Sequence, residues 1–110
     1  MKRQQIGELE ELVLLAVGGI NQEAYAVSIL EILKEQAGRN VDVTAIHSVL
    51  RRLENKGLVT STMGGATNER GGRRKKFFTL TSVGRATLDD IMDVRSAMYQ
   101  KMPRLSFFRI

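Results

Sequence analysis

The sequence predicts a mainly helical α+β domain in which a β-hairpin separates three helices from a longer fourth helix. Three stretches before residue 57 place apolar residues at the i, i+3, i+4, i+7 spacing of an amphipathic helix. Two short runs rich in β-branched and aromatic residues follow, with a glycine-rich segment between them. Residues 82 to about 102 then return to helical spacing. We therefore expect one body over residues 1–81, followed by a helix and tail over residues 82–110.

The first two helices are predicted over residues 6–17 and 23–37. Three glutamates favour the start of the first helix, because the positive end of the helix dipole lies there. A glycine follows the last apolar position of each helix and is expected to end it. Tyr25, near the start of the second helix, is expected at the edge of the core, and a phosphate contact through its hydroxyl is the alternative.

The stretch from Asp42 to Gly57 is predicted as a third helix with two unlike faces, ended by Gly57 in the left-handed conformation. The apolar face is expected to anchor the helix to the core and carries Ile46, Val49, Leu50 and Leu53. The opposite, polar face spans about 100° and carries Thr44, His47, Ser48, Arg51 and Asn55. Such groups can hydrogen-bond to phosphates and to base edges in a major groove. An ordinary amphipathic surface helix has the same pattern, so this stretch alone leaves both interpretations open.

A β-hairpin with a basic tip is predicted after the third helix. Its strands are residues 58–63 and 76–81, and four glycines between them permit the backbone to bend. The basic residues of the tip can contact phosphates or enter a minor groove, and they are Arg70, Arg73, Arg74 and Lys75. A nucleotide-binding loop is the weaker alternative, because the sequence lacks the GxxxxGK[ST] pattern and its strand-to-helix context.

The helix predicted after Thr81 or Ser82 has an apolar seam that suits a subunit contact. The helix is about 30 Å long, and the core is expected to be complete without it, so the seam is assigned to a homodimer interface. The interface residues predicted on this helix and on the first one are Leu9, Leu12, Leu88, Ile91, Arg95, Met98 and Met102. Arg95 is the charged member, and we expect it to pair with an aspartate of the partner or to lie at the edge of the seam.

The excess positive charge of the chain is concentrated in one part of its length. The net charge is +5, and residues 42–76 alone hold eight basic and three acidic residues, whereas basic and acidic residues balance in the remainder. Charge gathered in this way favours a surface that binds a polyanion such as a nucleic acid over an evenly solvated surface.

Several function classes are excluded by composition. The chain has no cysteine and one histidine, and its adjacent acid pairs point about 100° apart on their helices, so no catalytic set or metal site can be assembled. We therefore expect no enzyme activity, no cofactor and no metal. No apolar run approaches the ~20 residues of a membrane-spanning helix, and residues 1–11 lack the apolar segment of a signal peptide. A cytoplasmic protein without membrane contact is expected.

The predicted order of elements is that of a winged helix-turn-helix protein, and four sequence blocks resemble one family with this fold. GELEELVLLAV, EAYAVSI, VTAIHSVLRRLENKGLV and ERGGRRKKFFTLTSVG are similar to successive blocks of the PadR-like transcriptional regulators, over about residues 6–90. The resemblance implies a homodimeric regulator, usually a repressor, that binds an inverted-repeat operator through the middle helix and the hairpin wing. It also implies dimerisation through the C-terminal helix, and some members of the family sense small aromatic or phenolic ligands.

Two residues depart from the pattern of this family. His47 stands where the family commonly has tyrosine, so the base or phosphate contact at that position is expected to differ. Ala26 replaces the glycine that often follows the tyrosine matched by Tyr25, which affects how closely the helix approaches the DNA backbone. The absence of tryptophan argues against a stacked aromatic ligand site, and the single C-terminal helix places the chain with the shorter members.

These patterns support two hypotheses about function. In the first, the chain is a homodimeric transcriptional regulator that binds double-stranded DNA with sequence preference, with a small-molecule effector as a further candidate partner. In the second, the winged helix is an adaptor whose basic face engages an acidic protein, since fold alone does not decide function. Retardation of random duplex DNA at low salt separates the two hypotheses.

Overall fold

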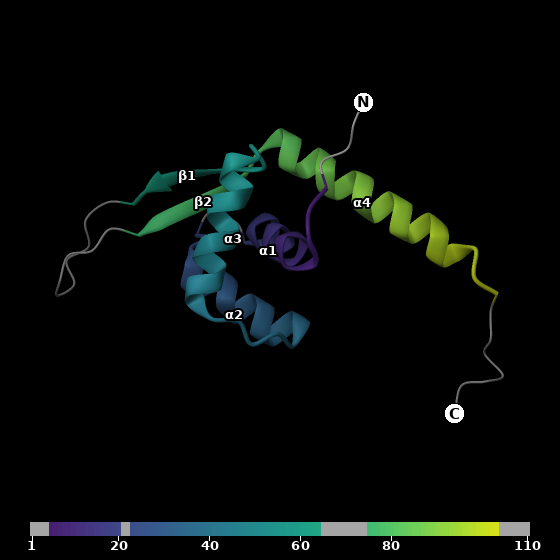
Figure 1. Cartoon of the computed structure of the whole chain (residues 1–110), viewed down its shortest axis with the longest axis horizontal. Coiled ribbons are helices and arrows are strands. Elements are labelled where there is room, and N and C mark those ends of the chain that lie inside the picture. Colours follow the sequence, from purple (N-terminus) through teal and green to yellow (C-terminus); the bar gives the residue numbers. More distant parts are fainter. Residues whose placement is uncertain (1–4, 21–22, 65–74, 104–110) are drawn as a thin grey trace.

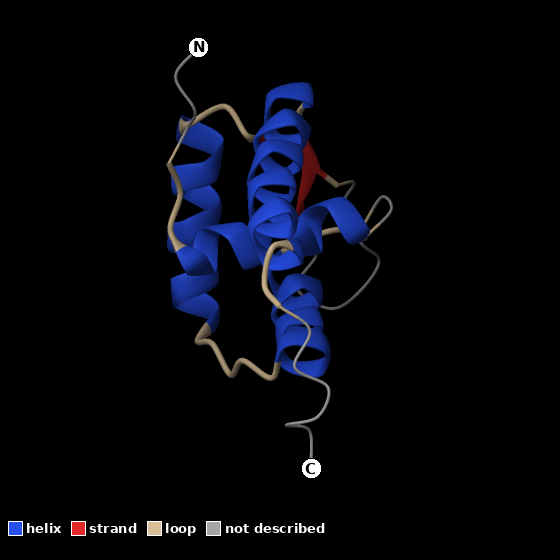
Figure 2. Ribbon diagram, turned by 90° about the vertical axis from the view of Figure 1, so that its right-hand side faces the viewer, coloured by secondary structure: helices blue, strands red, loops and turns tan. Residues whose placement is uncertain are grey.

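The computed structural model describes residues 5–20, 23–64 and 75–103. Its elements are the helices and strands α1 (Glu8–Gly19), α2 (Ala26–Ala37), α3 (Val43–Asn55), β1 (Val59–Met63), β2 (Lys76–Leu80) and α4 (Ser82–Gln100). The first three helices form the body, and the hairpin and α4 project from it to opposite sides (Figure 1). Helices make up most of the molecule, and the strands form a small element beside them (Figure 2). The predicted winged helix-turn-helix fold is confirmed.

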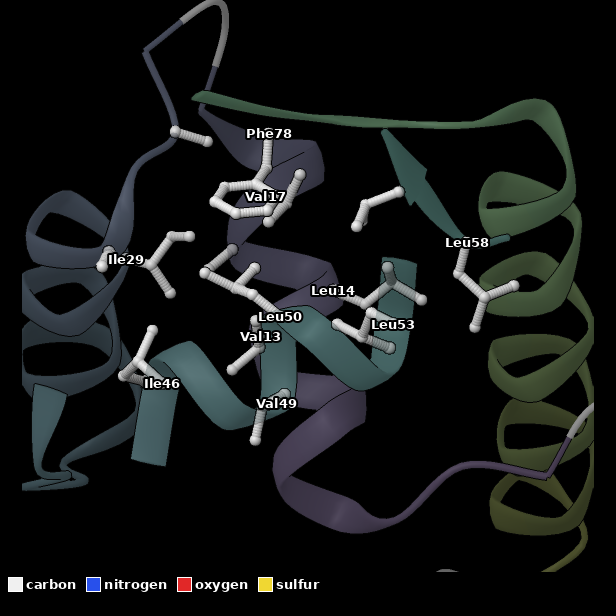
Figure 3. Packing of buried hydrophobic residues seen from close by; sticks show 14 of the residues in the cluster. Val13, Leu14, Val17, Ile29, Ile46, Val49, Leu50, Leu53, Leu58 and Phe78 are labelled. Carbon is white, nitrogen blue, oxygen red and sulfur yellow. The ribbon is translucent and has the colours of Figure 1, made fainter. Parts of the chain in front are cut away.

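The core lies where α1, α2 and α3 meet. All four apolar residues predicted for the inner face of α3 are at most 1% exposed, namely Ile46, Val49, Leu50 and Leu53. Figure 3 shows these side chains pointing toward Val13 and Leu14 of α1 and Ile29 of α2, with Phe78 of β2 closing the core from the hairpin. Burial of each such side chain stabilises the fold by about 1.5–3 kcal/mol, so α3 is firmly anchored by this face.

Helix α2 begins at Ala26, three residues later than the sequence predicts. The carbonyl of Ala24 accepts a hydrogen bond from the N–H of Phe78 at 2.8 Å, so the chain ahead of α2 is bonded to β2. Tyr25 follows in extended conformation as the N-cap, and its N–H donates to Ser28 Oγ at 3.0 Å. The predicted start at residue 23 was therefore wrong, because a long-range hydrogen bond holds these residues out of the helix.

The helix ends carry most of the predicted caps. Gly38 (φ 64°) ends α2, and Gly57 (φ 77°) follows α3 in the left-handed conformation that favours glycine. Asp42 occupies the N-cap position of α3, although its side chain accepts no capping hydrogen bond. At the start of α4, Thr81 Oγ1 accepts from the N–H of Gly84 at 2.9 Å and donates to the carbonyl of Gly57 at 2.7 Å. Thr81 thus ties the end of the hairpin to the turn after α3.

Strands β1 and β2 pair antiparallel, with Val59 opposite Leu80 at the root and Met63 opposite Lys76 toward the tip. Leu58 and Val59 are buried at the root, whereas the residues of β1 beyond them are half-buried or exposed. The hairpin is therefore anchored to the body at its root, and Phe78 in the middle of β2 is buried in the core as well.

Only the first half of α4 packs against the body. Gly84, Thr87 and Leu88 are buried, and a Cβ on Gly84 would collide with the carbonyl of Leu58. All of residues 93–100 are exposed. Within residues 5–20, 23–64 and 75–103, no helix combines the length and the hydropathy needed to cross a membrane.

Candidate nucleic-acid interface

The polar face predicted on α3 points away from the core. Thr44, His47, Arg51 and Asn55 are exposed, and Ser48 is half-buried. Arg51 makes no hydrogen bond or ion pair with the part of the chain that the structure describes. Its guanidinium is therefore available to an acceptor outside the protein, such as a phosphate or a guanine edge.

The other two cations near the end of α3 bind a buried carboxylate. Arg52 Nε lies 3.5 Å and Lys56 Nζ lies 3.0 Å from Glu10 Oε2, while the N–H of Gly7 donates to Glu10 Oε1 at 2.8 Å. Burial raises the pKa of Glu10, but the Gly7 hydrogen bond and the two cations outweigh it, and the pKa ends below the ordinary value of a glutamate. Glu10 therefore fastens the end of α3 to the start of α1, a role that the sequence analysis missed.

Glu10→Gln is expected to lower the free energy of unfolding by about 1–2 kcal/mol near neutral pH, because charged hydrogen bonds to α3 are lost. The folded-state pKa lies below the unfolded one. The stabilisation is therefore present above about pH 4.3, the ordinary pKa of glutamate, and is lost as pH falls through the lower folded value. Urea unfolding across this range measures the difference between the two proteins.

The matched control for this prediction is Glu8→Gln, which removes an ion pair of a 75% exposed side chain and should leave stability almost unchanged. The unfolding free energies of wild type and Glu10→Gln should converge in acid. A gap between them that persists unchanged at the lowest pH would contradict the role assigned to the Glu10 carboxylate.

Glu54 connects α3 to both strands of the hairpin. Its Oε2 accepts a hydrogen bond from Ser61 Oγ of β1 at 2.6 Å, and its Oε1 lies 3.8 Å from Lys76 Nζ of β2. These contacts hold the hairpin at a defined inclination to α3. In the sequence Glu54 is only one of the three acidic residues within residues 42–76, because its partners lie on strands whose placement depends on the fold.

Tyr25 lies beside the tip-side end of β2 and is half-buried. Its ring meets the ring of Phe77 edge to face, with 5.8 Å between centroids, and Lys75 Nζ lies 4.5 Å from the centre of the Tyr25 ring. Lys75 itself is exposed. The other basic residues predicted for the wing lie outside the described residues, and they are Arg70, Arg73 and Arg74.

The residues predicted for the dimer interface fall into two groups. Leu88 is 5% exposed, and Leu9 and Leu12 are half-buried against the same core, so these three stabilise their own chain. Ile91 and Met92 are half-buried as well, and beyond them the apolar side chains of α4 are exposed. The most exposed are Met98 and Tyr99 on α4, at 69% and 74%, and Met102 just beyond its end, at 59%.

Arg95 finds its partner within its own chain. Its Nη2 donates to Glu11 Oε1 at 2.8 Å, which joins α4 to the first turn of α1. The expected partner was an aspartate of a second chain, or none at the edge of the seam, because periodicity along α4 does not show which helix α4 packs against.

Residues 13–90 match the profile of the "Transcriptional regulator PadR-like family". Two solved structures with a similar fold cover most of the chain. A PadR-like transcription factor from Bacteroides fragilis is 25% identical over 84% of each chain, with a TM-score of 0.70. A Streptococcus transcriptional regulator is 26% identical over 84% of this chain and 86% of that one, with a TM-score of 0.66.

A third structure is that of Bacillus subtilis PadR in complex with operator DNA. It is 24% identical, with a TM-score of 0.64, over 77% of this chain and 46% of that one, so it shares the fold over less than half of its own length. Comparison with curated proteins finds no match. Because the family profile covers most of its length, including α2, α3, both strands and the packed part of α4, this chain belongs to the PadR-like family of transcriptional regulators.

Proposed function

We propose that the chain is a homodimeric transcriptional repressor that binds double-stranded DNA with sequence preference, on an inverted-repeat operator. In this proposal residues 1–81 bind DNA, and residues 82–110 form the dimerisation helix and tail. Helix α3 enters the major groove, and the hairpin contacts the flanking minor groove or backbone. The observation that carries the proposal is the uncovered polar face of α3 opposite four buried apolar residues.

The chemistry of this face suits a DNA groove. Arg51 offers a guanidinium that can bind the O6 and N7 atoms of guanine together, and Asn55 offers a carboxamide that can pair with adenine in the same way. Thr44 and Ser48 supply hydroxyls that can donate to phosphates. The surplus of basic residues between residues 42 and 76 supports the attraction to phosphates on which non-specific binding depends.

Dimerisation through α4 is supported by its uncovered apolar end. Met98 and Tyr99 on the outer end of α4 and Met102 just beyond that end are each more than half exposed. Exposed apolar side chains gathered in this way mark interaction sites. A two-fold dimer presents two copies of α3, and helix-turn-helix dimers place them about 34–36 Å apart, one turn of DNA.

Two further parts of the proposal rest on family resemblance. A small-molecule ligand relieves repression by releasing the DNA, as for those relatives that sense aromatic compounds. The protein acts in the cytoplasm, as expected for a regulator of transcription in this family.

Affinity for the preferred duplex is expected to fall steeply with salt, by about 10³- to 10⁵-fold between about 50 and 200 mM if a dimer neutralises about six to ten phosphates. Selection from a random duplex library supplies the preferred sequence, fluorescence anisotropy gives the affinity, and light scattering gives the mass of the free protein. A persistent monomer contradicts the dimer. No retardation of random duplex at low salt favours instead the adaptor that engages an acidic protein.

A further inference from the structure

The first turn of α1 carries three glutamates, each bonded to a cation from a different part of the chain. Glu8 Oε1 accepts from Arg39 Nη1, in the connection between α2 and α3, at 2.8 Å. Glu10 holds the two cations at the end of α3. Glu11 Oε1 accepts from Arg95 Nη2 of α4 at 2.8 Å. Neighbouring residues on a helix point about 100° apart, so Glu10 and Glu11 can tie two different helices to one turn.

The Glu11–Arg95 pair lies where α4 leaves the body. Leu88, two turns earlier, is 5% exposed, whereas all of residues 93–100 are exposed. The Glu11 side chain is 14% exposed and that of Arg95 is 65% exposed, so the carboxylate belongs to the body and the guanidinium reaches back to it from the free half of α4. The ion pair therefore lies where it can fix the direction in which the exposed second half of α4 leaves the body.

The direction of α4 matters because the helix is long. A helix of 19 residues spans about 28 Å, and its part beyond the buried Leu88 about 18 Å, so a tilt of about 10° about Leu88 moves its far end by about 3 Å. This displacement is close to the rise of one base pair, about 3.4 Å. In a two-fold dimer the same tilt occurs in both copies, so the separation of the two α3 helices depends strongly on it.

We infer that the Glu11–Arg95 ion pair sets the half-site spacing that the dimer accepts, by fixing the angle between α4 and the DNA-binding body. This inference rests on the proposed function, namely DNA binding by a dimer joined through α4. Glu11 and Arg95 are positioning residues: each lies on a different element from α3, and the bases that α3 reads do not depend on them. Loss of the pair broadens the range of spacings without changing the half-site sequence.

The test compares Glu11→Gln and Arg95→Gln with a matched control on the same helix. Arg85→Gln removes an ion pair of similar kind, Arg85 Nε to Asp89 Oδ1 at 3.2 Å, that lies within α4 and does not reach the body. In the double variant Glu11→Arg with Arg95→Glu the two residues are exchanged, so that an ion pair can still join α1 and α4 with the two charges reversed. Anisotropy titrations use inverted repeats of the selected half-site, spaced in steps of one base pair, together with a single half-site.

Wild type and Arg85→Gln should prefer one spacing. Glu11→Gln and Arg95→Gln should lower the ratio between the best spacing and its neighbours by about two- to fivefold, the effect of one partly exposed ion pair, with affinity for the single half-site unchanged. The exchanged variant should restore the ratio. An unchanged ratio in both single variants overturns the inference while DNA binding stands. A wild type with no specific binding, or with no dimer, overturns the proposed function itself and the inference with it.

Discussion

Replacing Arg51 with alanine is expected to lower affinity for the selected operator by about tenfold per half-site, and so by about 100-fold for a dimer that uses both copies. The physical reason is that Arg51 is exposed on the outer face of α3 and has no partner among the residues that the structure describes. Affinity for random duplex should fall much less, because a base contact adds discrimination and phosphate contacts supply most of the non-specific attraction. Anisotropy titrations with both duplexes measure the two losses.

Arg52→Ala is the matched control for this prediction, since the two residues are adjacent and equal in charge. Arg52 Nε is directed to Glu10, so its removal should change operator affinity by less than about threefold, with a small loss of stability. Arg73→Ala, at the tip of the predicted wing, should instead weaken binding to all duplexes similarly. Equal losses for Arg51→Ala and Arg52→Ala, or equal losses on operator and random DNA, would contradict the assignment of base reading to Arg51.

The contrast between Arg51 and Arg52 shows what sequence can and cannot predict here. Helical periodicity placed Arg51 on the polar face of α3, and it correctly predicted the four buried residues opposite, because the period of 3.6 is a property of the helix alone. It made no prediction for Arg52. Which arginine is free depends on where Glu10 lies, and that follows from the packing of α1 against α3. The partner of Arg52 is therefore set by a contact with another helix, which periodicity along α3 does not contain.

Elements whose shape depends on distant partners were predicted less well. The start of α2 was placed too early, since a hydrogen bond from β2 to Ala24 holds the preceding residues extended. Leu88 was assigned to the dimer interface because it lies on the same helical seam as Met98, yet the first half of α4 packs on the core of its own chain. Periodicity gives the face of a helix on which a residue lies, and the fold decides what covers that face.

Gly84→Ala is expected to lower the free energy of unfolding by about 2–3 kcal/mol, and thereby the melting temperature by about 10–20 °C. Alanine normally favours a helix over glycine by about 1 kcal/mol, so the prediction runs against intrinsic propensity. It follows from packing: the added Cβ would collide with the carbonyl of Leu58 and lie 2.9 Å from Cδ1 of Leu80, and backbone cannot move aside as a flexible side chain can. Thermal unfolding followed by circular dichroism measures the change.

The control is Gly19→Ala at the end of α1, where an added Cβ meets nothing within 4 Å and stability should be unchanged or slightly higher. The effect of Gly84→Ala should also extend to DNA binding, because the Leu58 carbonyl accepts the N–H of Thr81 at 3.1 Å, and Thr81 caps α4. Relief of the collision must move α4 away from the root of the hairpin and disturb this cap. If Gly84→Ala melts at the temperature of wild type, α4 does not pack against the body as closely as the structure requires. The angle between α4 and the body would then not be fixed, and α4 could not set the spacing of the two α3 helices.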